Sequence, residues 1–299
     1  MLMSVPNVSE GVDQAALKAI GDAFAPPGGA TRLLDVHSDV DHHRSVFTLV
    51  SEQGSLAVDL ATGCAKAHEL IDISGHAGIH PHVGAVDVVP VVYLHPEDRG
   101  AACAEALAAA HDIATKTGTP VFLYGELAAG RERAVIRQGG TKGLAERIAS
   151  GEQNPDFGPQ ALDPAKGATL VGARPPMVAF NLQLAAGETV ETAKEIAAQI
   201  RESGGGPKGV RSIGLQLDEI DRAQVSCNIH DPFTTPLAEI VGRVRSEAPV
   251  ESAELVGLAP QAAFEGFPED LPIPGFDPQR HILENALQNP ALFGHRRLD

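Results

Sequence analysis

The chain is poor in aromatic residues and in positive charge. It has no tryptophan, two tyrosines and ten phenylalanines among 299 residues, so its core must be built from Ala, Val, Leu and Ile. Lys and Arg number 23 against 39 Asp and Glu, which gives a formal net charge of −16. Nucleic acids and anionic membranes bind clustered Lys and Arg, so this balance argues against both as partners. A small anionic substrate is not excluded, because it needs only a local basic pocket.

Cysteine and long hydrophobic runs are also scarce. The three cysteines, Cys64, Cys103 and Cys227, are far apart and form neither a disulfide framework nor a CxxC metal site. No apolar run reaches membrane-spanning length, and the start of the chain lacks the basic and apolar regions of a signal peptide. We therefore expect a soluble protein of the reducing cytoplasm.

Hydrophobic spacing predicts the order β-α-β-β-α-β twice along the chain. In the first half, strands are expected at 1–6, 32–36, 46–50 and 86–93, with helices at 13–24 and 55–71. In the second half, strands are expected at 177–184, 210–217, 223–229 and 251–257, with helices at 189–203 and 236–248. This order is typical of ferredoxin-like units, each an antiparallel sheet with helices on one face. The fold class is thus α/β (α+β), with subdomains at 1–174 and 175–299.

The two halves are separated by further elements. A helix is expected at 98–117 and a strand at 120–124, followed by a long segment at 125–166. Residues 151–167 are rich in Pro, Gly, Asn and Asp and lack periodicity, which indicates a functional loop or a linker. After Pro260 the chain is proline-rich and offers one short helix, which we expect to pack on the surface or on a second subunit.

Three histidines, His76, His80 and His82, stand in a run of small residues just before the expected strand at 86–93. Pro81 and the neighbouring glycines disfavour a helix, so the imidazoles are expected on a loop at the mouth of a strand, where chemistry is common. Histidine exchanges protons near neutral pH, so a proton-transfer site led by His80 is one interpretation.

Other interpretations of these histidines remain open. The alternative function is a metal-dependent amidohydrolase using His76, His80 and His82, with a further ligand from among Asp39, Asp41, His42 and His43. A His pair at i and i+4 binds one metal on a helix, however, and Gly78 and Pro81 disrupt that helix. His80 could also be a loop histidine that caps a backbone group. No phosphate-binding GxxxxGK[ST] or GxGxxG motif stands in the required frame.

Nine short strings, in this order along the chain, resemble the formiminotransferase domain family from about Met3 to about Pro260. They are Val5-Pro-Asn-Val-Ser-Glu-Gly11, Asp41-His-His-Arg-Ser-Val-Phe-Thr-Leu49, His80-Pro-His-Val-Gly-Ala-Val-Asp87, Leu123-Tyr-Gly-Glu126, Pro155-Asp-Phe-Gly-Pro159, Gly172-Ala-Arg174, Ala179-Phe-Asn181, Ala223-Gln-Val-Ser226 and Leu255-Val-Gly-Leu258. Each string alone is weakly specific, but nine strings in the same order are strong evidence for the resemblance.

The resemblance implies glutamate formimidoyltransferase activity, a one-carbon transfer of histidine degradation. The formimino group of N-formimino-L-glutamate would pass to N5 of tetrahydrofolate, with formyl transfer between 5-formyltetrahydrofolate and glutamate as a further reaction. It also implies a folate groove between two subdomains, a homodimer and no metal. Family members in animals carry a cyclodeaminase as well, for which this chain is too short.

The resemblance also implies site residues. The histidine of the family's His-Pro-Arg motif falls on His80, the expected catalytic residue, whereas His82 stands where the family has arginine. The folate-contacting segment falls on Gly158, Pro159, Gln160, Ala161, Leu162, Asp163, Pro164, Ala165, Lys166 and Gly167. Asn7, Arg44, Asp87 and Arg174 are the expected substrate-binding residues. Replacement of arginine by histidine at 82 removes a bidentate cation.

Overall fold

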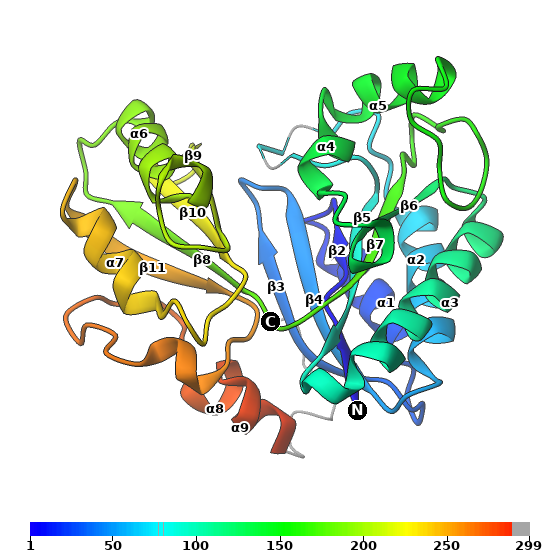
Figure 1. Ribbon diagram of the computed structural model, residues 1–299, viewed down its shortest axis with the longest axis horizontal. Coiled ribbons are helices and arrows are strands. Elements are labelled where there is room, and N and C mark those ends of the chain that lie inside the picture. Colours follow the sequence, from blue (N-terminus) through cyan, green and yellow to red (C-terminus); the bar gives the residue numbers. More distant parts are fainter. Residues whose placement is uncertain (77, 80, 289–299) are drawn as a thin grey trace. The chain divides into compact units, whose positions relative to one another are not determined.

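The structure, a computed structural model, describes residues 1–76, 78–79 and 81–288 (Figure 1). Among the described residues the chain divides into two compact units, residues 1–175 and residues 176–288. Each unit is built around its own sheet and its own hydrophobic core.

The sheet of the first unit combines antiparallel and parallel strands. Its strands are β1 (Leu2–Ser4), β2 (Asn7–Val8), β3 (Arg32–Asp39), β4 (Arg44–Ser51), β5 (Val86–Tyr93), β6 (Val121–Gly125) and β7 (Thr169–Arg174). Strands β1 and β2 lie in line between β4 and β5, and β3 pairs with the outer side of β4. The order β5, β1/β2, β4, β3 is the ferredoxin-like arrangement, all antiparallel, as the sequence predicts.

Beyond β5 the same sheet continues with two parallel pairings, β5 with β7 and β7 with β6. The sequence predicted antiparallel sheets and no strand at β7, so this extension is a difference from expectation. Parallel neighbours need a crossover connection. Here α3 (Arg99–Thr117) links β5 to β6, and α4 (Arg133–Arg137) with α5 (Gly140–Ala149) links β6 to β7. Helices α4 and α5 lie within the segment 125–166, where the sequence analysis placed no helix.

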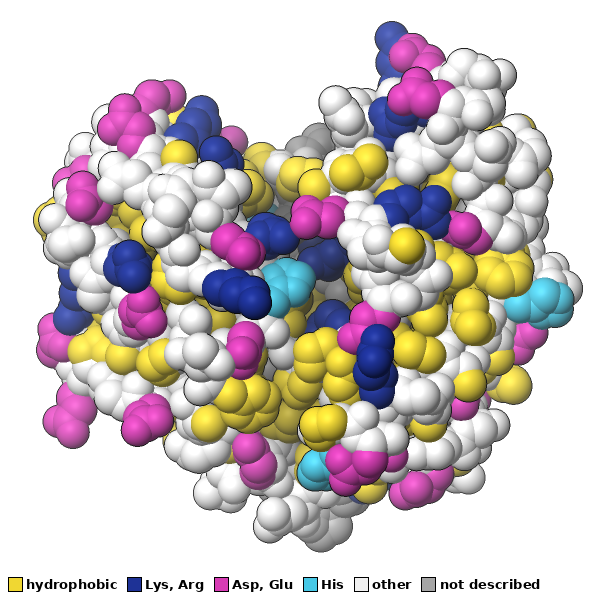
Figure 2. Space-filling view, in the orientation of Figure 1, with side chains coloured by type: hydrophobic (Ala, Val, Ile, Leu, Met, Phe, Trp, Pro, Cys, Tyr) yellow, Lys and Arg dark blue, Asp and Glu magenta, His cyan; other side chains and the backbone are white. Residues whose placement is uncertain are grey.

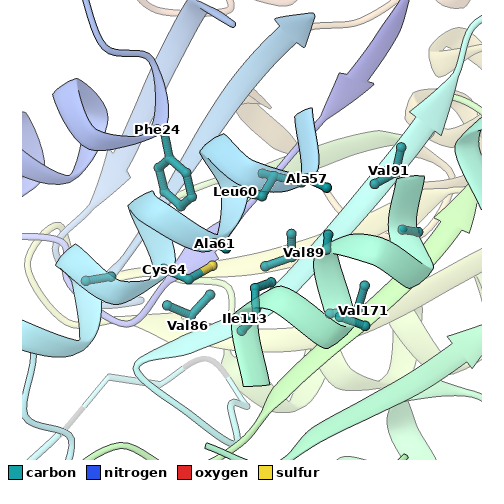
Figure 3. Close-up of a cluster of buried hydrophobic side chains, with 14 of the residues drawn as sticks. Phe24, Ala57, Leu60, Ala61, Cys64, Val86, Val89, Val91, Ile113 and Val171 are labelled. Atoms are coloured by element: carbon teal, nitrogen blue, oxygen red, sulfur yellow. The ribbon is translucent and has the colours of Figure 1, made fainter. Parts of the chain in front are cut away.

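The helices of the first unit cover both faces of its sheet. Helices α1 (Gln14–Phe24), α2 (Leu56–Leu70) and α3 pack on one face, where Phe24, Leu60 and Ile113 meet the valines of β5 (Figure 3). Helices α4 and α5 pack on the opposite face through Ile136, Leu144 and Ile148. The short 3-10 turns of this unit are at Pro96–Asp98 and Glu126–Ala128.

Two helix starts in the first unit show how caps fix the helices. The Asp13 carboxylate accepts hydrogen bonds from the amides of Ala15 and Ala16 at 2.9 Å, so it caps α1. Helix α2 is capped from α3, because the buried Glu105 carboxylate accepts from the amides of Gly54 and Ala57 at 2.9 and 2.7 Å.

The second unit is ferredoxin-like, with the strand order β11-β8-β10-β9, all antiparallel. Its elements are β8 (Val178–Leu184), α6 (Val190–Ile200), β9 (Val210–Leu217), β10 (Arg222–Ile229), α7 (Leu237–Arg245), β11 (Val250–Val256), α8 (Pro278–His281) and α9 (Leu283–Gln288), with 3-10 turns at Glu202–Gly204 and Gln261–Phe264. The proline-rich stretch after Pro260 packs on this unit's own core through Phe264, Phe267 and Phe276.

Charge on one face of the molecule is mixed rather than segregated. On the face shown in Figure 2, acidic side chains are interspersed with Lys and Arg, and no broad basic field is visible. None of the described helices is both long and apolar enough to cross a membrane.

His68 lies buried near the end of α2, with 7% of its surface exposed. Neither ring nitrogen has a hydrogen-bond partner. Burial lowers the pKa of His68 to about 4; nearby Lys166 lowers it further and Asp163 opposes the shift. Below pH 6.5 the unfolded chain therefore binds a proton that the folded chain does not, and stability falls as the pH drops from 6.5 toward 4.

We predict that His68→Leu removes this acid-side loss. Between pH 7.5 and pH 5, the wild type should lose about 2 kcal/mol of unfolding free energy through His68, a loss absent in the variant. Urea denaturation at the two pH values measures it. His111→Leu is the control, since the His111 side chain is 66% exposed. Equal pH dependence in the wild type and His68→Leu would contradict the prediction.

Candidate active site

Four segments that are distant in the sequence meet in the first unit at the entrance to β5. They are the end of β2, the bend between β3 and β4, the histidine-containing turn before β5, and the end of the segment 158–167. The sequence singled out each of them separately, and backbone contacts bring them together.

The histidine-containing turn is paired through its backbone with the end of the segment 158–167. The amide of Ala168 donates to the carbonyl of Val83 at 2.8 Å, and the amide of Ala85 donates to the carbonyl of Lys166 at 2.9 Å. Gly84 and Gly167 form an antiparallel bridge between these bonds. A methyl group on either glycine would overlap the opposite backbone, so only glycine fits this crossing.

The end of β2 is fastened to the same turn. The amide of Ser9 donates to the carbonyl of Ala85 at 2.9 Å, and the Ser9 hydroxyl donates to the carbonyl of Gly84 at 2.8 Å. Ser9 therefore joins β2 to the turn through both its amide and its hydroxyl. Gly11 packs against the backbone of the β3–β4 bend, where a methyl group would overlap Asp39 and Arg44.

The imidazoles of His43, His76 and His82 form a contiguous row in this region. The ring of His76 lies with its centroid 4.7 Å from that of His43 and 4.3 Å from that of His82. The amide of Gly11 donates to Nδ1 of His43 at 3.2 Å. Burial lowers the pKa of His76 to about 4, and it also lowers the pKa of His82. Both rings are therefore neutral near pH 7.

A buried ion pair is hydrogen-bonded to the histidine-containing turn. Arg137 forms a salt bridge with Asp87, and the Asp87 carboxylate also accepts from the amide of Val83 at 3.1 Å. Asp87 is 1% exposed and the Arg137 side chain 14%. Burial raises the pKa of the Asp87 carboxyl, but Arg137 and Arg44 together lower it below its ordinary value. Asp87 thus remains charged and links α4 to the turn.

Further guanidinium groups gather beside this pair. Arg44 donates to the side-chain oxygen of Asn7, and the side-chain nitrogen of Asn7 donates to the carbonyl of Val5 at 2.7 Å. Burial lowers the pKa of Arg44 to about 9; Asp87 opposes this shift, whereas Arg137 and Arg133 add to it. Arg44 therefore keeps its charge at neutral pH, close to two other arginines.

Arg174, at the end of β7, belongs to the same region. Its Nη1 donates to the carbonyl of Pro175 at 2.9 Å, while its buried Nε has no hydrogen-bond partner. Burial lowers the pKa of Arg174 to about 10; Tyr124 opposes this shift and Arg133 adds to it. The positive charge of Arg133 therefore acts on both Arg44 and Arg174.

The sequence-predicted site residues fall into three groups. His80 lies outside the described residues, so its role stays a prediction. Asn7, Arg44, Asp87 and Arg174 are all in the first unit, in the contacts described above. The segment 158–167 has an exposed first part, whereas at its end the Lys166 ammonium donates to the carbonyls of His68 and Ile71. Lys166 therefore ties the segment to α2.

Sequence reasoning missed Arg133 and Arg137. The signal that could have found them is their spacing of i and i+4, which places both guanidinium groups on one face of a helix. That helix is short, and it stands in a stretch of low hydrophobic periodicity.

The metal interpretation finds no support among the described residues. Within residues 1–76, 78–79 and 81–288, no group of three or more His, Cys, Asp or Glu side chains is arranged to hold a metal ion.

We predict that Gly167→Ala destabilises the protein more than Gly151→Ala. Both glycines have left-handed φ, +69° and +74°, so each alanine costs about 1–2 kcal/mol in backbone strain. Only at Gly167 does the added methyl overlap the carbonyl of Val83, which should add about 1–3 kcal/mol. Urea denaturation of both variants tests this, and equal losses would contradict the observed crossing of the turn and the segment.

We predict that Asp87→Ala lowers the unfolding free energy by about 3–5 kcal/mol, because it leaves Arg137 as an uncompensated buried charge. Arg137→Met combined with Asp87→Ala should cost less than the sum of the single changes. The contribution of Asp87 is present above pH 3.9 and disappears as the pH falls through its lowered folded-state pKa. Additive losses in urea denaturation would show that the two side chains are not coupled.

Comparison with known families agrees with this arrangement. The N-terminal subdomain of the formiminotransferase domain matches residues 1–174, and the formiminotransferase domain model matches residues 179–266. The matched regions thus include every described site residue named above.

Similar proteins extend over nearly the whole chain. A glutamate formimidoyltransferase of Streptococcus pyogenes is 36% identical over 95% of this chain and 97% of its own length. One from Thermoplasma acidophilum is 36% identical over 96% and 97%. The formimidoyltransferase-cyclodeaminase of Sus scrofa is 39% identical over 87% of this chain, which spans 50% of that protein. The chain belongs to the formiminotransferase family.

Proposed function

We propose that this protein is a glutamate formimidoyltransferase, which transfers the formimino group of N-formimino-L-glutamate to N5 of tetrahydrofolate and releases L-glutamate. The observation that carries the proposal is the pairing of the histidine-containing turn with the end of the segment 158–167, beside a group of arginines. Two relatives with that name match nearly the full length of the chain, which supports the same function. The amidohydrolase alternative has no such support.

The segment 158–167 is the proposed folate-contacting part of the site. Residues 158–161 and 163–164 are exposed and free of regular structure, which suits a loop that receives a ligand. Its far end is held by the bonds of Lys166 and by the crossing at Gly167. A folate bound there would stand next to the turn that contains His80 in the sequence.

His80 is the proposed catalytic residue. In the reaction, N5 forms a bond to the formimino carbon, and the bond from that carbon to the glutamate nitrogen breaks. The departing nitrogen needs a proton, because an amide anion is a very poor leaving group. His80 would take the proton from N5 and return it to the glutamate nitrogen, so no external acid is consumed. Such general acid–base catalysis typically contributes ~10²–10⁴-fold.

The neighbouring side chains have supporting roles in this proposal. Asp87 is assigned as a positioning residue, because its carboxylate is occupied by Arg137 and by the amide of Val83. Asn7 orients Arg44. Arg44 and Arg174 supply positive charge for substrate carboxylates.

His82, which replaces the family arginine, carries no charge near neutral pH because burial lowers its pKa. Arg137 and Arg44 both act electrostatically on His82, so cationic charge is present next to this position. We propose that these two arginines supply the positive charge that the family places on the third residue of its motif.

We predict that His80→Ala lowers turnover of N-formimino-L-glutamate with tetrahydrofolate by ~10²–10⁴-fold while folate still binds. Glutamate release measures turnover, and titration with 5-formyltetrahydrofolate measures binding. His111→Ala, an exposed change on α3, is the control. Retained turnover in His80→Ala would remove His80 from the mechanism.

Two further measurements separate the related possibilities. Glutamate release that requires tetrahydrofolate and resists a chelator supports the transferase, whereas folate-independent release lost on chelation would overturn it. Incubation of 5-formyltetrahydrofolate with glutamate tests formyl transfer. The homodimer and the cytoplasmic location also stay predictions, and light scattering of the purified chain tests the first.

A further inference from the structure

We propose that Lys166 is a positioning residue for the transfer reaction, because its side chain fixes the base of the histidine-containing turn instead of binding the folate. This inference rests on the proposed function, since it names a role within that same site. It separates Lys166 from the other residues of the segment 158–167, which the family resemblance assigns to folate contact.

The ammonium of Lys166 is engaged at the end of α2. It donates to the carbonyl of His68 and, at 3.3 Å, to the carbonyl of Ile71. The last carbonyls of a helix have no partner within the helix, and α2 ends at Leu70. A cation suits this place, because the C-terminal end of a helix carries partial negative charge. Two of the three N–H groups of the ammonium are thus used by α2.

Residues 163–167 form a compact turn, the Asp163 turn, that carries Lys166. The amides of Lys166 and Gly167 donate to the carbonyl of Asp163 at 3.1 and 2.8 Å. The amide of Ala165 donates to the Asp163 carboxylate at 2.9 Å, and Asp163 also forms an antiparallel bridge with Gly167. Because these bonds converge on one residue, the Asp163 turn is a closed unit, and the Lys166 side chain attaches that unit to α2.

The Asp163 turn holds both ends of the histidine-containing turn. The amide of Ile73, before the histidines, donates to the carbonyl of Ala165 at 3.0 Å. The amide of Ala85, after the histidines, donates to the carbonyl of Lys166 at 2.9 Å. The two carbonyls belong to consecutive residues, so a single piece of backbone closes the histidine-containing turn at its base. Lys166 ties this piece to the helix from which the histidine-containing turn departs.

Loss of the Lys166 ammonium should therefore act on the chemical step. Without the ammonium, the Asp163 turn can shift against α2, and both ends of the histidine-containing turn shift with it. Proton transfer requires its groups to lie within hydrogen-bond reach, and a displacement of about 1 Å can lower a rate ~10²-fold. Residues 158–161, the exposed part of the proposed folate contact, precede the Asp163 turn and take no part in these bonds. Folate affinity should therefore be preserved.

The kinetic test compares Lys166→Met, which keeps the aliphatic part of the side chain but has no N–H donor, with Lys166→Arg, which keeps the charge and the donors. Lys166→Met should lower kcat with N-formimino-L-glutamate and tetrahydrofolate by ~10–100-fold, while the Kd for 5-formyltetrahydrofolate stays unchanged. Lys166→Arg should recover most of the activity, because arginine can also bond the last carbonyls of a helix. Lys18→Met removes an exposed cation of α1 and should behave as the wild type.

Hydrogen exchange tests the same inference without turnover. In Lys166→Met, the amides of Ile73 and Ala85 should exchange faster than in the wild type, because they donate to carbonyls of the Asp163 turn. The amides of β10, in the second unit, are the internal control and should exchange at the same rate in both proteins. If the wild type shows no turnover, the proposed function fails, and the exchange rates alone decide whether Lys166 holds the histidine-containing turn.

Three results would overturn the inference and leave the transferase standing. Weaker binding of 5-formyltetrahydrofolate with unchanged kcat in Lys166→Met would make Lys166 a folate ligand. Equal losses of kcat and of folate affinity would show a role in folding alone. Unchanged kcat with unchanged exchange at Ile73 and Ala85 would show that the histidine-containing turn does not depend on Lys166. If Lys166→Met does not fold, Lys166→Gln, which lacks the charge but keeps a shorter donor, is measured against the same expectations.

Discussion

The backbone crossing between the turn before β5 and the segment before β7 is the constraint on which the site depends. It places Val83–Ala85 against Lys166–Ala168 through two hydrogen bonds, and both glycines at its centre lack room for a side chain. Strands β5 and β7 then continue from this point as parallel neighbours. Because the crossing is made of backbone, it positions the two segments without using their side chains.

The charge in the region of the site is opposite in sign to the net charge of the whole chain. The protein carries a formal charge of −16, yet Arg44, Arg133, Arg137 and Arg174 gather in one region of the first unit. Guanidinium groups suit this arrangement because they stay charged even when burial lowers their pKa. The histidines nearby behave differently, since burial lowers the pKa of His76 to about 4 and makes the ring neutral. Fixed cations and neutral imidazoles thus lie side by side, which suits binding of an anion next to proton transfer.

Much of the fold could be predicted from hydrophobic spacing. Both ferredoxin-like units follow from strands and helices long enough to show their period, and Asp13 caps α1 at the start of the expected helix 13–24. Strand β7 was missed because it is buried between two parallel neighbours and lacks the alternation of a half-exposed strand. Helices α4 and α5 were missed because they bury only Ile136, Leu144 and Ile148, too few residues to reveal a helical period.

The sequence by itself determined the family, the order of elements in each unit and the segments that carry polar chemistry. Motif strings and hydrophobic periods are local properties of the sequence, so they can be recognised without a structure. Only the tertiary structure decided the partners of those segments. It joined Asp87 to Arg137 across fifty residues, turned Ser9 toward Gly84, and placed Arg133 over Tyr124. Such contacts depend on how the sheet and its crossover helices bring together residues that are distant in the sequence. No local sequence pattern specifies which of these residues become neighbours.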